Sequence, residues 1–345
     1  VQQRVARVRA TQSRRLRHHH ALHCRPGTAL PGPPSAIIYD FYVNKPPRLT
    51  RASLYGPANA LVLAWFVAAG VVTIAHRSVP AAGWLMVHLL LLGGVSTAIL
   101  LWSQHFAETL LRRPAPGGRR WLWARLWGWS GGAALVTAGM IASLTPLVLA
   151  GAIVCGVVAI GHLVVLVLQR RGSTRMLGNR FSHLVRYYLL ATALVPFGVA
   201  LGVILARVDV SPEVAGRLHV AHLVLLMLGW VGVTVAGTLV LLWPTVLRTQ
   251  ISPRADAAGK RALPVMLGGL LLAVAGPAFG LRVLVGAGAI VIVIAIAMLG
   301  VHVVAQARAA SNTASLFAAT SMAASLVWFL ISVAWFGAAV SVAPN

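Results

Sequence analysis

The chain has few acidic residues and few cysteines for its length. Only five of its 345 residues are Asp or Glu, and of these only Glu108 falls inside a long apolar run. Carboxylate ligands for a metal are therefore nearly absent from such runs. Cys24 lies in a basic N-terminal arm and Cys155 inside an expected helix, which argues against a disulfide. The sequence also carries no phosphate-binding glycine loop, nucleophile triad or cysteine zinc motif.

Charge is scarce, whereas apolar residues are abundant. Charged residues make up 10% of the chain and hydrophobic residues 59%, with a mean hydropathy of +0.83. Several apolar runs exceed the roughly 20 residues that cross a bilayer core. The net charge of +24 comes mainly from arginines between these runs and in the N-terminal arm, so it indicates membrane topology rather than nucleic-acid binding. The composition predicts a multi-pass membrane protein, with lipid as its surroundings.

We expect an all-α fold, a polytopic transmembrane helix bundle of about nine spans within residues 55–341. Basic residues, among them Arg125, concentrate before the first span and after each even-numbered span. Because cytoplasmic loops carry the excess of Arg and Lys, the N-terminus is expected inside and the C-terminus outside. Pro277 and Gly280 make the seventh and eighth spans the weakest pair. The expected spans are 57–76, 81–110, 127–145, 147–168, 184–206, 216–246, 262–280, 283–306 and 314–341.

The first 50 residues differ from the rest. They are rich in Arg and Pro, have no apolar periodicity and are expected to form a disordered basic arm, 1–50. A cluster of His18, His19, His20, His23 and Cys24 has metal-binding side chains, but the composition fits a merely basic arm equally well. Since the chain begins with Val, a true start further downstream, near Val43, is an alternative. We assign no function to this arm.

Six histidines lie inside the expected spans, where an ionisable side chain is costly and is usually functional. Their depth along the spans divides them into two layers. The outer layer is His88, His219 and His222, and the inner layer is His105, His162 and His302. His76 and His183 lie at span ends, where water or lipid headgroups account for them. Four tryptophans near one inner boundary indicate an interfacial aromatic belt: Trp121, Trp123, Trp127 and Trp129.

The outer layer is the stronger candidate for a metal or cofactor site. Neutral imidazole is a common protein ligand for iron, copper and zinc. His219 and His222 are three residues apart and share one helix face, so both can point into one cavity with His88. We expect these three side chains to bind haem b, a copper ion, or one of each.

The inner layer has two readings. His105 can hold a second haem together with His162 or His302, since two layers suit electrons that cross the membrane. Alternatively, single histidines such as His162 are hydrogen-bond partners between helices. Glu108, one turn after His105, either orients that imidazole or extends to the inner surface.

Two segments carry a family resemblance. The stretch "HVAHLVLLMLGWVGVTVAGTLVLLWPTVL" resembles the histidine-bearing helix of membrane proteins related to haem–copper oxidase subunit I, and "GWLMVHLLLLGGVSTAILLWSQHFAETLLR" resembles another helix of such proteins. Both are similar to the membrane half that precedes exported cupredoxin domains in actinobacterial multicopper oxidases and copper nitrite reductases. The adjacent histidine pair of true oxidases is absent from the spans. The matching positions of the first stretch are His219, His222, Leu223, Gly229, Trp230, Val231, Gly232, Gly237, Thr238 and Pro244.

The resemblance implies a multi-pass protein of a bacterial plasma membrane with a function in electron transfer. We expect an integral membrane redox domain that binds haem, with copper as a second candidate, and passes electrons to an extracytoplasmic cupredoxin-type protein or domain. At most it would be one component of an oxidoreductase. One alternative is a metal transporter or sensor that uses the same histidines, and another is a non-redox anchor or assembly protein. The oligomeric state stays open.

Overall fold

The computed structural model describes residues 51–173, 181–250, 252–309 and 316–342, which are all helical apart from short loops. Residues 53–345 form one compact unit, and the expected arm, 1–50, lies outside the described residues. Most helices are α-helices, whereas η1 and η3 are π-helical and η2 is a short 3₁₀ helix. The elements are α3 (Arg51–Ile74), α4 (Ala82–His88), η1 (Leu89–Val95), α5 (Ser96–Leu111), α6 (Gly118–Ile141), α7 (Thr145–Ser173), η2 (Ser182–Leu184), α8 (Val185–Arg207), α9 (Pro212–Leu223), η3 (Val224–Gly232), α10 (Val233–Val246), α11 (Pro253–Phe279), α12 (Arg282–Ala309) and α13 (Leu316–Val342).

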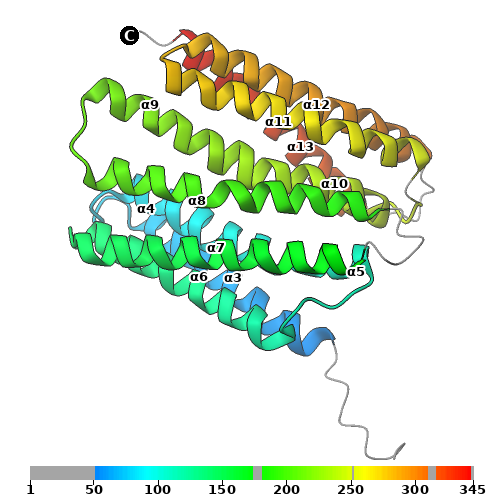
Figure 1. Ribbon diagram of the computed structural model, residues 1–345, viewed down its shortest axis with the longest axis horizontal. Helices are drawn as coiled ribbons and strands as arrows, with labels where there is room; N and C mark the ends of the chain where they lie inside the picture. Colours follow the sequence, from blue (N-terminus) through cyan, green and yellow to red (C-terminus); the bar gives the residue numbers. More distant parts are fainter. Residues whose placement is uncertain (1–50, 174–180, 251, 310–315, 343–345) are drawn as a thin grey trace, which may run out of the picture. The chain divides into compact units, whose positions relative to one another are not determined.

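Some consecutive elements join end to end into one long helix, which we call a rod. The elements α4, η1 and α5 form one rod, and α9, η3 and α10 form another (Figure 1). Within the described ranges, eight rods are long and apolar enough to cross a membrane. The ninth, α6, has 24 residues but begins with the polar sequence "GRRWLWARLWGW", which lowers its hydropathy. The fold is therefore the expected all-helical bundle of a multi-pass membrane protein.

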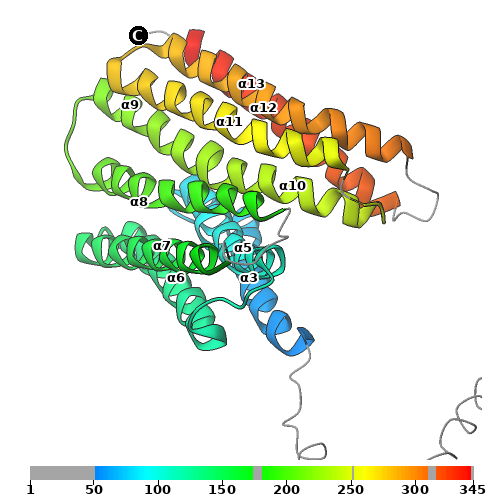
Figure 2. The ribbon, with the colours of Figure 1, turned by 45° about the vertical axis from the view of Figure 1, so that its right-hand side comes forward.

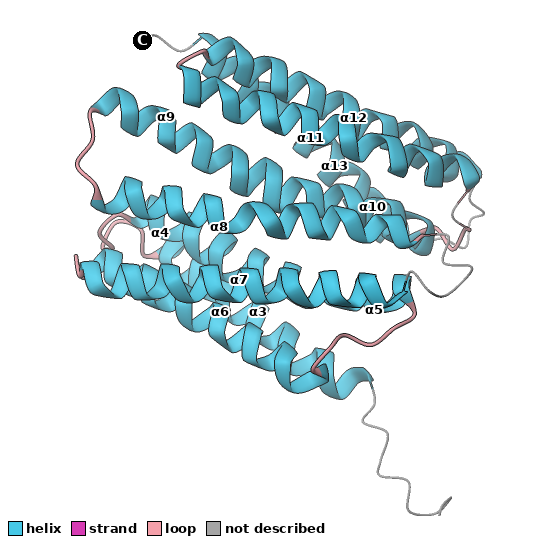
Figure 3. Ribbon diagram, viewed as in Figure 1, coloured by secondary structure: helices cyan, strands magenta, loops and turns pink. Residues whose placement is uncertain are grey.

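The rods run back and forth, so the loops collect at two ends (Figures 1 and 3). We call the end with the α5–α6, α7–η2, α10–α11 and α12–α13 connections the arginine-rich end, and the opposite end the arginine-poor end. The seventh and eighth expected spans are separate helices. α11 ends at Phe279, Gly280 follows with φ of 68°, and α12 begins at Arg282. These two helices pack closely, since a Cβ on Gly269 would lie 2.9 Å from the Gly288 carbonyl oxygen.

Helix α8 connects two groups of rods. It packs against α7 on one side and against α9, η3 and α10 on the other (Figure 2). Its fully buried Tyr187 and Tyr188 belong to the core. The Tyr188 hydroxyl lies 3.2 Å from the Thr238 hydroxyl on α10, within hydrogen-bonding distance. Helix α8 thereby contacts two rods that we call the histidine-bearing rods. One consists of α4, η1 and α5 and carries His88, and the other consists of α9, η3 and α10 and carries His219 and His222.

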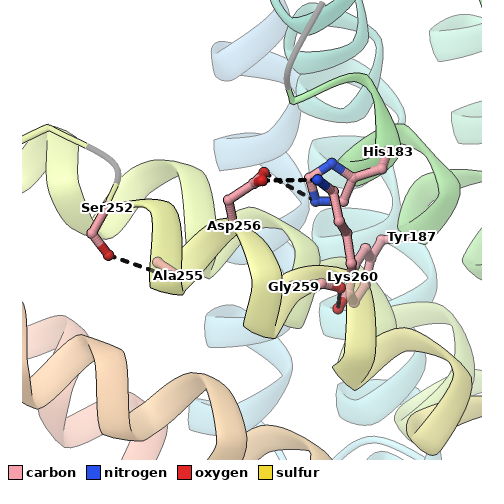
Figure 4. Close-up of polar contacts among 7 residues, drawn as sticks. All are labelled: His183, Tyr187, Ser252, Ala255, Asp256, Gly259 and Lys260. Atoms are coloured by element: carbon pink, nitrogen blue, oxygen red, sulfur yellow. Dashed lines mark hydrogen bonds and ion pairs between the residues drawn. The ribbon is translucent and has the colours of Figure 1, made fainter.

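A charged cluster joins η2, which directly precedes α8, to α11 at the arginine-rich end (Figure 4). The Asp256 carboxylate lies 2.9 Å from the Lys260 ammonium and 3.6 Å from His183 Nε2. Nearby, the Tyr187 hydroxyl donates a hydrogen bond of 2.7 Å to the Gly259 carbonyl. The side chain of His183 is only 10% exposed, so the interpretation that water or headgroups account for it was wrong.

Candidate functional site

A large cavity lies between the two histidine-bearing rods. Its volume is about 670 Å³, within the range of pockets that hold small molecules and cofactors. The walls come from α4–η1–α5, α6, α7, α8 and α9–η3, and they are mainly apolar. The lining includes His88, His219, His222, Trp84, Ser96, Trp129, Met140, Cys155, Gly202, Met227 and Trp230. The structure thus brings the three residues of the expected outer layer to one cavity.

His88 is held in a defined orientation at this cavity. Its Nδ1–H donates a hydrogen bond of 2.8 Å to the Trp84 carbonyl, and its ring stacks on the Trp84 indole at a centroid distance of 3.9 Å. A carbonyl can only accept, so Nδ1 carries the proton in this hydrogen bond. The lone pair of neutral His88 is then on Nε2. Metal-binding histidines characteristically donate their other N–H in this way.

His222 repeats the arrangement between two helices. Its Nδ1–H donates a hydrogen bond of 2.9 Å to the Gly198 carbonyl on α8, which again leaves the lone pair on Nε2. The ring lies against Gly202 of the same helix, where a Cβ would be 3.0 Å from His222 Cε1. Two glycines on α8 therefore provide the carbonyl and the space that fix this ring.

His219 lies one turn nearer the arginine-poor end and is more exposed than His222. It also lines the cavity, and both His219 and His222 are close enough to interact electrostatically with His88. In the described part of the chain, however, no group of three His, Cys, Asp or Glu side chains has a geometry that could hold a single metal ion. A closed ion site made by all three histidines is thus not what this arrangement provides.

Both rods change from α- to π-helix directly beside their histidines. η1 begins at Leu89, the residue after His88, and η3 begins at Val224, two residues after His222. π-Helical turns inside α-helices occur frequently at functional sites. The coincidence in both rods is a local feature that supports a functional cavity.

Hydrogen bonds satisfy polar groups that the π-helical turns bring to the cavity wall. The Ser96 hydroxyl donates to the Leu91 carbonyl at 2.8 Å and accepts from the Trp230 indole N–H at 3.0 Å. The Trp129 indole N–H donates to the Leu92 carbonyl at 2.8 Å. Trp129 is 1% exposed, so its assignment to an interfacial aromatic belt was wrong.

The three residues of the expected inner layer lie in three different surroundings. His105 Nδ1 shares a hydrogen bond of 2.6 Å with the Tyr55 hydroxyl of α3, and its ring also contacts Trp102. His302 on α12 lines a narrow gap with Trp243 and Gln306, facing α10 and α11. The structure does not bring these side chains together in one site.

His162 is fully buried, and both of its ring nitrogens make hydrogen bonds. The Arg125 guanidinium donates to Nδ1 at 2.7 Å, so the imidazole proton is on Nε2, which donates to the Ser103 hydroxyl at 2.9 Å. No ring nitrogen is left for a metal. The structure therefore favours the alternative in which His162 is a hydrogen-bond partner between helices.

The contact with Arg125 extends into a buried polar network that sequence reasoning missed. Arg125 was counted among the loop arginines, but it lies within α6 and is 5% exposed. Its guanidinium also donates to the Gln104 side-chain oxygen, and the Gln104 amide donates to Glu108 at 3.0 Å. Glu108 accepts a further hydrogen bond of 3.2 Å from the Ala115 backbone N–H. Arg125 and Trp129 are four residues apart and so lie on one face of a helix. This spacing was the signal in the sequence that Arg125 belongs to a helix rather than to a loop.

Comparison with known proteins leaves the site to be interpreted from its own geometry. No protein-family profile, curated protein or solved structure matches the chain. The resemblance to membrane domains related to haem–copper oxidase subunit I therefore stays a hypothesis. The cavity and its histidines are the observations on which a function can be proposed.

Proposed function

We propose that this protein is a membrane redox domain that binds haem b in the cavity through His88 and His222. The observation that carries the proposal is the shared arrangement of these two rings. Each is on a different rod, lines the same 670 Å³ cavity and donates its Nδ1–H to a backbone carbonyl, so that its Nε2 lone pair is available. Two such imidazoles on facing helices would hold a haem in a helical bundle.

The donor set and the cavity fit such a group better than they fit a bare metal ion. An ion held by protein alone needs three or four ligands, whereas haem iron needs only one or two from the protein. The apolar lining suits a porphyrin, and Trp84 and Trp230 add aromatic surface. When bound, haem would supply a one-electron change at its iron. The chain would hold the group, fix both imidazole orientations and exclude water.

The topology of the arginines supports the direction of electron flow. The cavity lies toward the arginine-poor end, since His88 and His222 fall in the first third of the 30-residue rod that begins at Ala82 and the 35-residue rod that begins at Pro212. With cytoplasmic arginines the N-terminus is inside, the C-terminus is outside and the cavity faces the exterior of the plasma membrane. Electrons would then pass to an extracytoplasmic cupredoxin-type copper protein or domain.

One observation favours a second candidate, a copper transporter or sensor. Met140, Met227 and Cys155 line the cavity together with the histidines, and soft sulfur ligands select Cu(I). His219, exposed at the arginine-poor end, would then be the first residue to meet the ion. This candidate predicts metal-dependent stability and no haem absorption.

A reduced-minus-oxidised spectrum with iron and copper analysis of the purified protein tests the proposal. The wild type is expected to show a b-type Soret band with stoichiometric iron, which His88→Ala and His222→Ala lose. His76→Ala is the matched control, because His76 is exposed at the same end and is absent from the cavity lining. A flat wild-type spectrum without iron would refute haem binding, and copper in its place would favour the second candidate.

A further inference from the structure

The buried polar network around Arg125 adjoins the wall of the cavity that His88, His219 and His222 line, on the side of the arginine-rich end. On three helices, a residue of the cavity wall shares a helix face with a residue of the network that lies nearer the arginine-rich end. The two residues of a pair are four positions apart on α6, about 6 Å along the helix, and seven positions apart on α5 and α7, about 10.5 Å. The pairs are Ser96 and Ser103 on α5, Cys155 and His162 on α7, and Trp129 and Arg125 on α6.

The network holds a fixed positive charge. A guanidinium stays protonated in proteins, and the three groups that accept hydrogen bonds from Arg125 are all neutral: His162 Nδ1, the Gln104 oxygen and the Trp121 carbonyl. The nearest compensating acid is Glu108, which acts on Arg125 through space and is separated from it by Gln104. These neutral partners therefore fix the position of the guanidinium but do not neutralise its charge.

A buried charge acts strongly on its neighbours, because the low dielectric of the interior weakens screening. Reduction adds one electron to a redox group in the cavity, and a nearby cation favours that state. We infer that Arg125 sets the midpoint potential of the group bound in the cavity by stabilising its reduced state, and that Glu108 partly offsets this effect. The inference rests on the proposed haem function and assigns a regulatory role to residues outside its ligands.

Conduction of protons is the competing role for such a network. A guanidinium does not release its proton, and Arg125 stands between Glu108 and His162 in the hydrogen-bonded chain. Protons could not pass through it by that chain. The electrostatic role needs no such step.

The test is redox potentiometry of the haem in the purified full-length chain. In Arg125→Gln the midpoint potential should fall, with a decrease of about fivefold to tenfold in the ratio of reduced to oxidised haem at a fixed potential. Arg125→Lys should keep most of the wild-type value. In Glu108→Gln the potential should rise, since the amide oxygen can still accept from Ala115 and Gln104 while the negative charge is gone. Arg120→Gln is the matched control, because Arg120 is exposed on the same helix.

Opposite shifts in Arg125→Gln and Glu108→Gln would support the inference, since a purely structural role gives no such pattern. Unchanged potentials, or shifts in one direction for both variants, would overturn it and leave haem binding intact. If Arg125→Gln does not fold, Glu108→Gln decides alone, with a rise in support and no rise against. A wild type without haem would overturn both this inference and the proposed function.

Discussion

His222 is partly buried and His162 is fully buried in the bundle, and their hydrogen bonds give them different chemistry. His222 donates one N–H to the Gly198 carbonyl and keeps the other nitrogen available at a cavity. His162 has both nitrogens engaged, by Arg125 and by Ser103. A histidine in a membrane protein is therefore a ligand candidate only when its second nitrogen is unoccupied.

The largest effect on stability is expected when the His162 imidazole is removed. In His162→Ala the Arg125 guanidinium loses a buried acceptor and the Ser103 hydroxyl loses its partner. Loss of a hydrogen bond to a buried charged group costs about 1.5–3 kcal/mol. We expect a marked fall in the free energy of unfolding, measured by denaturation in mixed micelles. His88→Ala, which removes one hydrogen bond to a carbonyl, should cost only about 1 kcal/mol. Equal losses in both variants would contradict the assignment.

A smaller effect is expected when the space beside the His222 ring at Gly202 is filled by a side chain. A side chain at Gly202 meets the imidazole, since a Cβ would already be 3.0 Å from Cε1. Gly202→Val should displace the ring and lower haem affinity by about tenfold or more, as changes around a metal ligand do. Titration of the haem-depleted protein with hemin measures the affinity. Gly268→Val is the control, because a Cβ there meets no atom within 4 Å. Unaltered affinity in Gly202→Val would show that His222 is not held as a ligand.

A third change loosens the wall between the two π-helical turns. Ser96→Ala removes the acceptor of the Trp230 indole N–H and the donor to the Leu91 carbonyl. The expected loss is about 1–2 kcal/mol in the free energy of unfolding, together with faster haem release. Stopped-flow transfer of haem to an acceptor globin measures the release rate. Stability and release identical to those of the wild type would argue against a structural role of this contact.

The smallest effect is expected at an exposed ion pair on the same helix as His222. Arg217 and Glu213 form an exposed pair one turn apart on α9. Glu213→Gln should change the free energy of unfolding by less than about 1 kcal/mol, because water screens such pairs. Its haem spectrum should match that of the wild type. A large loss of stability would mean that the network of Arg125 is not exceptional among the charged groups of this protein.

The sequence was sufficient for the helices and for one of the two histidine layers. Hydropathy predicted nine spans, and the structure has nine long helical rods in its described part. The three-residue spacing of His219 and His222 correctly placed both on one cavity with His88. These features follow from periodicity along the chain.

The remaining features depend on which helices become neighbours. Arg125 looked like a loop residue because three arginines and four tryptophans lower the hydropathy of the start of α6. Only packing against α5 and α7 supplies the Gln104 and His162 that accept its hydrogen bonds. Similarly, His302 matched His162 in depth but faces α10 and α11. Depth can be read from a sequence, whereas the direction around the helix axis and the identity of the neighbours could not.

The most direct test compares His222→Ala with His162→Ala by reduced-minus-oxidised spectroscopy and iron content per folded protein. The account predicts that the His222 variant lacks the b-type spectrum and its iron, while the folded fraction of the His162 variant retains both. Retention of haem by His222→Ala together with its loss from folded His162→Ala would contradict the assignment of the cavity as the binding site.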